Sequence, residues 1–219
     1  MPAAAPDDLV TAIKAGDAET VRARVREDPK LAAARDGDGL PVVLLALFHR
    51  QQAAADALLE AGPELGVPEA AALGLADRLR ELLRADPERL DDRTPEGFTA
   101  IGLAAFLGGP EAVGVLLEHG ADPDSDPENP MRVRPVHAAA AAHDRESLRL
   151  LLEAGADPNA RQQGGLTPLH AAAHSDDAEM AQLLLAHGAD ASIAADDGRD
   201  AARLAADEGS AQVARLLGR

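Results

Sequence analysis

The sequence contains no cysteine, no tryptophan and no tyrosine, and only three of its 219 residues are phenylalanine. Without cysteine, the chain has no disulfide, no thiolate metal ligand and no cysteine nucleophile, which fits a reducing compartment. Basic residues are also scarce, since 21 Lys and Arg stand against 38 Asp and Glu, for a net charge of −17. A field of that sign repels phosphate backbones and anionic lipid headgroups, so we expect no binding to nucleic acid or membrane.

Long hydrophobic runs are missing as well. The first residues, MPAAAPDDLV, lack the basic start and the apolar core of a signal peptide. Other apolar stretches are interrupted before they reach the length that spans a membrane. We therefore expect a soluble cytoplasmic protein.

Alanine and leucine, two strong helix formers, dominate the apolar residues, and the chain repeats itself. Residues 97–124, 132–159 and 165–192 each give a short apolar helix, a tight turn, a longer helix that ends in Leu-Leu, and then Gly-Ala-Asp. The same frame fits residues 198–217 and, upstream, three further units. This periodicity predicts an all-α repeat solenoid of about seven helix pairs.

The sequence resembles the ankyrin repeat family, whose motif is Thr-Pro-Leu-His-x-Ala at a period of about 33 residues. Thr167, Pro168, Leu169 and His170 match the motif, and Pro135 and His137 match it one unit earlier. Residues 66–219 also resemble a group of bacterial ankyrin proteins through the runs EAAALG, GFTAIGLAAF and NPMRVRPVHAAA. The resemblance implies short β-hairpin fingers between the helix pairs, and it implies that the motif histidine bonds to the motif threonine and to neighbouring backbone.

The turns inside the helix pairs are evenly spaced, with one exception. They fall at the positions Gly16, Arg50, Gly74, Gly108, His143, Asp176 and Gly209. The interval from 50 to 74 is about ten residues short, which predicts that the finger before Pro68 is missing. We divide the chain there into residues 1–65, an N-terminal cap with the first repeats, and residues 66–219, the main array with its C-terminal cap. We expect both parts to form one continuous solenoid, in which the front part was added to an older array.

His170 and His174 lie four residues apart, so a helix presents both rings on one side, as in some zinc sites. His143 would be the nearest further ligand. Because the motif role already explains His170, we expect no metal and no cofactor. We expect no acid–base catalysis either, although carboxylate pairs such as Asp91-Asp92 are common. The Asp-rich residues 121–129 lack the spacing of a calcium loop and are interpreted as a solvated finger tip.

The positive functional signal is the surface lined by the first helix of each pair. Its candidate partner-binding residues are Leu45, Phe48, Leu73, Leu103, Phe106, Leu107 and His174. Aromatic anchors of this kind are typical of binding hot spots. We predict a monomeric, non-catalytic adaptor that docks another protein, with a basic surface, on the concave face. The alternatives are a metal-dependent enzyme with a hidden site near His170 and His174, or a structural element that assembles with itself.

Overall fold

The computed structural model describes residues 4–126, 128 and 131–218. These residues form α-helices joined by turns and loops, and they contain isolated β-bridges but no sheet. In chain order the helices are α1 (Asp7–Ala15), α2 (Ala18–Glu27), α3 (Val42–Phe48), α4 (Gln52–Leu59), α5 (Val67–Ala72), α6 (Ala76–Ala85), α7 (Ala100–Leu103), α8 (Pro110–Glu118), α9 (Pro135–Ala141), α10 (Arg145–Glu153), α11 (Pro168–His174), α12 (Ala178–Ala186), α13 (Ala201–Glu208) and α14 (Ala211–Leu216).

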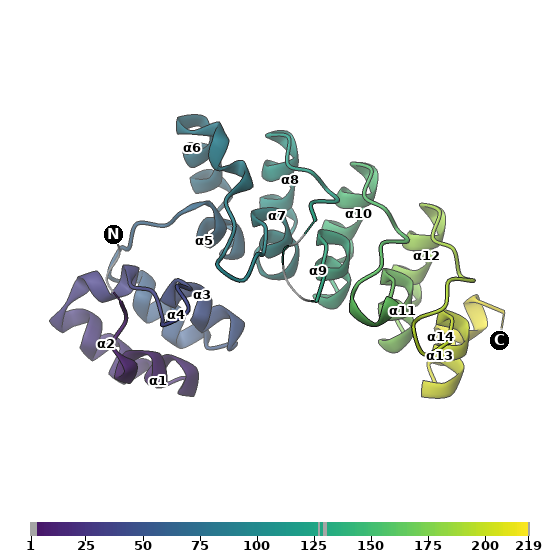
Figure 1. Ribbon diagram of the computed structural model, residues 1–219, viewed down its shortest axis with the longest axis horizontal. Helices are drawn as coiled ribbons and strands as arrows, with labels where there is room; N and C mark the ends of the chain where they lie inside the picture. The colour runs from purple at the N-terminus through teal and green to yellow at the C-terminus, as the bar shows by residue number, and fades with distance from the viewer. Residues whose placement is uncertain (1–3, 127, 129–130, 219) are drawn as a thin grey trace.

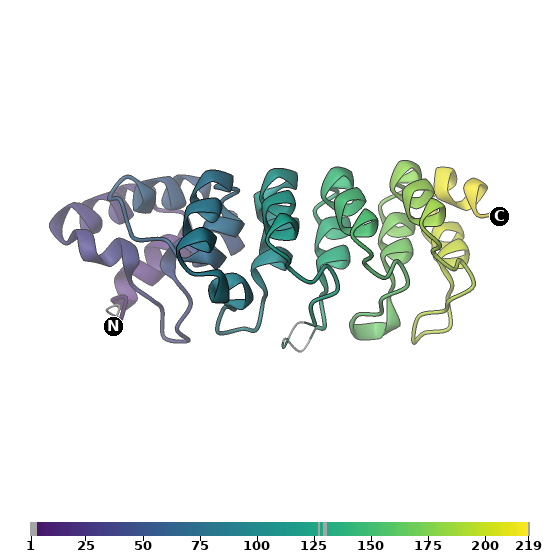
Figure 2. The same ribbon diagram turned by 90° about the horizontal axis from the view of Figure 1, so that it is seen from above.

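Consecutive helices pack in pairs, from α1 with α2 to α13 with α14, and each pair packs on the next. The pairs follow one another along the long axis of the molecule, and the connecting loops project from the same side of this row (Figures 1 and 2). The predicted all-α repeat solenoid is confirmed. One pair cannot bury its own apolar face, so the stacked neighbours supply the core.

Local sequence sets where the helices begin. The carboxylate of Asp17 accepts the backbone N–H of Thr20 at 3.0 Å, and Asp144 accepts that of Ser147 at 3.0 Å. Each carboxylate caps the second helix of its pair, since the first N–H groups of a helix have no partner within the helix. Pro135 and Pro168 stand in the first turns of α9 and α11, where a proline N–H is not needed.

The turns inside the pairs use the left-handed backbone region. Positive φ occurs at six of the seven predicted turn positions, namely Gly16, Arg50, Gly74, His143, Asp176 and Gly209. At the fourth turn the positive φ of 85° belongs to Gly109 instead of Gly108. The reason is that α7 continues as a π-helical turn, Ala104–Gly108, so Gly108 keeps a helical backbone.

Three of the loops between pairs are each closed by a single antiparallel bridge, which joins Arg35 to Pro41, Arg93 to Thr99 or Ala194 to Asp200. Between α4 and α5, residues 60–66 connect the two helices directly, and no bridge is found in this described segment. The short interval in the sequence corresponds to this short, direct connection. In Figure 1, α1 to α4 are turned out of the row that α5 to α14 form.

Candidate functional site

An apolar cavity of about 390 Å³ opens on the face formed by the first helices and the connecting loops. Three of the predicted binding residues, Phe48, Leu103 and Phe106, line it. The remaining walls come from the loop before α7, from Gly102 in α7, from the loop before α9, from α9 itself and from Gln162. Phe106 is 39% exposed and Met131 49%, and these are two of the few large apolar side chains exposed in the described part of the chain.

Phe98 lines the same cavity but was not among the predicted residues. Its ring lies 5.8 Å from that of Phe48, centroid to centroid, at an interplanar angle of 53°. Aromatic pairs in such tilted arrangements are favourable beyond the area they bury. Phe98 belongs to a loop, and only the approach of this loop to the end of α3 brings the two rings together. The helical periodicity of the sequence carried no signal for that contact.

The π-helical turn determines how Phe106 is presented. It is closed by a hydrogen bond from the N–H of Gly109 to the carbonyl of Ala104 at 2.8 Å. The turn also packs closely on the preceding pair, because a Cβ built on Gly108 would lie 1.9 Å from the carbonyl oxygen of Ala71. Only glycine permits this approach. π-helical turns inside α-helices often occur at functional sites, and this one carries the exposed aromatic ring.

The other predicted binding residues lie elsewhere. Leu73 and Leu107 line a second cavity, of about 330 Å³, which opens beside the turns of the second and third pairs. Leu45 is only 4% exposed and belongs to the core of the first pairs, so it offers no free surface. His174 is exposed on α11, where its Nδ1 lies 2.7 Å from Oε2 of Glu208. The predicted set is thus divided among the apolar cavity, a second cavity, the core and a contact with Glu208.

The motif histidine of α11 is held inside the fold. Nδ1 of His170 accepts the backbone N–H of Thr167 at 3.2 Å and lies 2.9 Å from the Thr167 hydroxyl. Nε2 therefore carries the proton and donates to the carbonyl of Arg199 at 3.1 Å. The motif residues Pro168 and Leu169 are buried beside it. Both ring nitrogens are occupied, so a metal ion would have to break an existing bond to bind His170.

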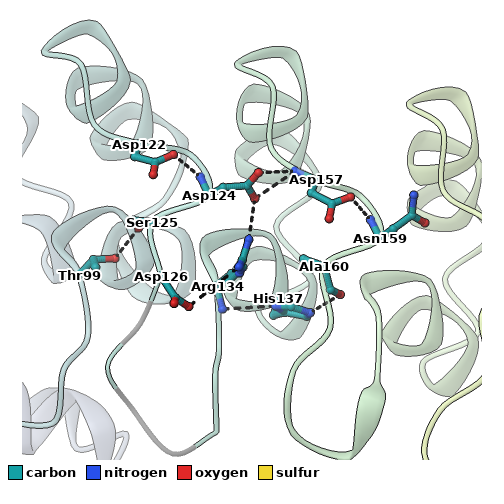
Figure 3. A network of polar contacts seen from close by, with 10 residues as sticks. All are labelled: Thr99, Asp122, Asp124, Ser125, Asp126, Arg134, His137, Asp157, Asn159 and Ala160. Carbon is teal, nitrogen blue, oxygen red and sulfur yellow. Dashed lines mark hydrogen bonds and ion pairs between the residues drawn. The ribbon is translucent and has the colours of Figure 1, made fainter.

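His137 repeats this arrangement one pair earlier. Its Nδ1 accepts the N–H of Arg134 at 3.3 Å, and its Nε2 donates to the carbonyl of Ala160 at 2.9 Å (Figure 3). Burial lowers the pKa of His137 to about 4, so the ring is neutral near pH 7. Pro135 is buried one turn away. The ring forms part of the apolar cavity wall and adds no charge to it.

The family model for ankyrin repeats in three copies matches residues 68–162 and, in a second match, residues 136–218. Together the two matches cover more than half of the sequence. The chain belongs to the ankyrin repeat family. A search among curated proteins found no match. Ankyrin repeats are generally protein–protein interaction modules and are typically non-catalytic.

In this ankyrin array, the Asp-rich segment connects neighbouring repeats. Both carboxylate oxygens of Asp124 accept the backbone N–H of Asp157, at 3.0 and 2.9 Å, and the carboxylate of Asp157 accepts that of Asn159 at 2.8 Å (Figure 3). The side chain of Arg134 lies 3.8 Å from Asp124. The interpretation of residues 121–129 as a solvated tip is therefore wrong for Asp124, whose carboxylate orders the next loop. Pro127 and Asn129 of this segment lie outside the described residues.

Two further searches concern only the described part of the chain. It contains no group of three or more histidine, aspartate or glutamate side chains placed to hold a metal ion. It also contains no helix that combines the length and the apolar character needed to cross a bilayer.

Proposed function

We propose that this ankyrin protein is a non-catalytic adaptor that docks a partner protein on its concave face, with the apolar cavity around Phe106 as the anchor site. In this proposal each of the seven helix pairs is one ankyrin-type repeat, and the bridged loops are its fingers. The observation that carries the proposal is the cavity of about 390 Å³, which is walled by three phenylalanines, two of them the predicted Phe48 and Phe106. Exposed apolar patches of this kind are typical of docking sites in soluble proteins.

The expected energetic contribution follows from the geometry. Phe106 is already 61% covered in the free protein, since 39% of it is exposed, so its ring is held in place before a partner arrives. A preformed aromatic anchor loses little conformational entropy on binding. Truncation of such an anchor typically costs about 2 kcal/mol or more, which corresponds to a loss of affinity of about 30-fold.

Further parts of the proposal rest on composition. The net charge of −17 favours a partner with a basic surface, because opposite charges speed encounter. A monomeric state and a cytoplasmic location remain predictions. No specific observation favours the metal-dependent enzyme, since the hydrogen bonds of His170 already occupy both ring nitrogens. Light scattering over a range of concentrations tests the self-assembling alternative.

The experiment that tests the proposal compares two equally exposed apolar residues. Leu75, at the start of α6, is 39% exposed, as is Phe106, but it does not line the cavity. Proteins captured from native cell extract by the parent chain are identified, and their dissociation constants are measured with purified material. We expect Phe106→Ala to weaken the complex about 30-fold, with unchanged circular dichroism, and Leu75→Ala to have no effect. Unchanged affinity in a Phe106→Ala, Met131→Ala double variant would refute docking at this cavity.

A further inference from the structure

The buried apolar residues form two clusters, and the front cluster also takes in a few residues beyond the connection between α4 and α5. Buried apolar residues from Leu9 to Leu58 form one cluster, to which Ala72 and Leu103 also belong, and those from Val67 to Ala214 form a second. We call residues 4–59 the front block and residues 67–218 the main block. Between them, α3 packs on α5, whereas the second helices of neighbouring pairs, such as α6 and α8, pack together only within a block. Helix packing across the junction therefore comes mainly from the first helices, α3 and α5.

Within the main block, backbone hydrogen bonds tie each loop to the next. In two of these bonds, those of Gln163 and Asp196, the donor is the second residue of the loop turn, whereas Glu128 donates from two positions earlier in its repeat; the acceptor in each case is a carbonyl of the preceding loop. These bonds run from Glu128 to Gly97 at 3.3 Å, from Gln163 to Met131 at 2.9 Å and from Asp196 to Gly164 at 2.8 Å. They fix the spacing and the angle of successive pairs.

At the junction no such bond is found among the described residues. The second turn position of the loop 93–99 is Pro95, which has no N–H, although the sequence also places Pro130 at the same position one repeat later. The loop still touches its neighbour, since a Cβ built on Gly39 would lie 3.5 Å from Cγ of Pro95. Among the described residues, no hydrogen bond links the front block to the main block. The two loops meet through van der Waals contact alone.

The hydrogen bonds of equivalent arginine residues show the same difference between the main block and the junction. Arg93 and Arg161 occupy equivalent places in their loops, and each donates from Nη1 to a carbonyl of the next loop, Asp126 at 2.9 Å and Ala194 at 3.0 Å. The equivalent Arg35 donates from Nη1 to Gly39 of its own loop at 2.9 Å. Its nearest carboxylate across the junction is that of Glu69, at 3.9 Å. Such a part-exposed ion pair contributes little to holding the blocks together.

The walls of the apolar cavity come from both blocks. Phe48 belongs to the front block, while Phe98 and Phe106 belong to the main block, and the contact between Phe48 and Phe98 crosses the junction. A third cavity, of about 450 Å³, lies between the blocks on the loop side, next to Gly66 and Arg89. Rotation at the junction would part Phe48 from Phe98 without disturbing any hydrogen bond between the blocks.

We infer that residues 60–66 form a hinge between two rigid blocks. The contact between Phe48 and Phe98 holds the blocks in the closed arrangement that completes the apolar cavity. Relative motion of two packed units is the ordinary expectation unless their interface is both large and hydrophobic. Closure of the hinge assembles the cavity, and opening removes one of its walls. The hinge would thereby control partner docking, and only this consequence rests on the proposed function. The hinge itself is a property of the free chain.

Because the chain has no cysteine, pairs of spin labels can be placed without further changes. Glu19 on α2, Glu111 on α8 and Ala211 on α14 are exposed. The pair Glu19→Cys with Glu111→Cys spans the junction over three repeat steps. The pair Glu111→Cys with Ala211→Cys spans three steps within the main block and is the matched control. Stacked helices lie about 10 Å apart, so both distances are about 30 Å, within the range of double electron–electron resonance.

We expect the distance distribution of the pair that crosses the junction to be at least twice as wide as that of the control pair. Phe48→Ala should widen the first distribution further and leave the control unchanged, with the same circular dichroism. Equal widths for the two pairs in the otherwise unmodified chain would overturn the hinge, as would a Phe48→Ala variant that widens both. The measurement needs no partner, so its failure would leave docking at Phe106 standing, and a failed capture experiment would leave the hinge standing.

Discussion

Replacement of Gly108 by alanine tests how the repeats beside the cavity are packed. A Cβ at Gly108 would lie 1.9 Å from the carbonyl oxygen of Ala71, whereas real Cβ atoms stay at least 3.0 Å from such an atom. The π-helical turn and α5 must therefore separate by about 1.1 Å, the difference between these distances. Overpacking of this kind costs about 1–3 kcal/mol, and a gain in helix propensity of up to about 1 kcal/mol opposes it.

Gly114 is the matched control. It lies inside α8, six residues further on, and a Cβ built there meets nothing within 4 Å. Gly114→Ala should therefore show only the gain in helix propensity, about 0.5–1 kcal/mol. For a chain of this size, 1 kcal/mol shifts Tm by about 2–4 °C.

Thermal unfolding followed by circular dichroism separates the two variants. We expect Gly108→Ala to lower Tm, by up to about 12 °C, and Gly114→Ala to raise it by about 1–4 °C. Because Phe106 is two residues before Gly108, the first variant should also weaken partner capture. A Tm for Gly108→Ala at or above that of the parent chain would show that the close approach to Ala71 does not constrain the stack.

Two further predictions concern the turns and pH. His143 has a φ of 55°, which costs a residue with a Cβ about 1–2 kcal/mol, so His143→Gly should raise Tm by a few degrees. Asp176→Gly should give no gain in Tm, because the carboxylate of Asp176 accepts two N–H groups at the start of α14. Equal gains in Tm for the two variants would contradict this reasoning. The pKa of His137 falls from 6.5 to about 4 on folding, so the unfolded chain binds the extra proton first. The contribution of neutral His137 to the free energy of unfolding is therefore fully present above pH 6.5 and is lost as pH falls towards 4, by up to about 3 kcal/mol. Chemical denaturation at pH 7 and pH 4.5 should show a smaller loss of this free energy in His137→Gln than in the parent chain. An identical loss in the two proteins would contradict the assignment.

The features that the sequence determined are local. Helix starts follow from capping aspartates and first-turn prolines, and the turns follow from residues that accept a left-handed backbone. The hydrogen bonds of His170 with Thr167 need only the spacing of the motif and one neighbouring loop. The short interval before Pro68 likewise indicated the short, direct connection through residues 60–66.

Tertiary structure decided which apolar residues share a surface. Phe48, Leu73 and Phe106 look alike in the repeat frame, yet Phe48 and Phe106 share one cavity with the loop residue Phe98, while Leu73 lies at another. The π-helical turn changes the direction of the side chains after Ala104, since each added residue rotates a helix by about 100°. The π-helical turn and the junction at residues 60–66 together determine how neighbouring repeats pack on each other. The repeat period of the sequence does not encode either feature, so the period alone could not place the cavity.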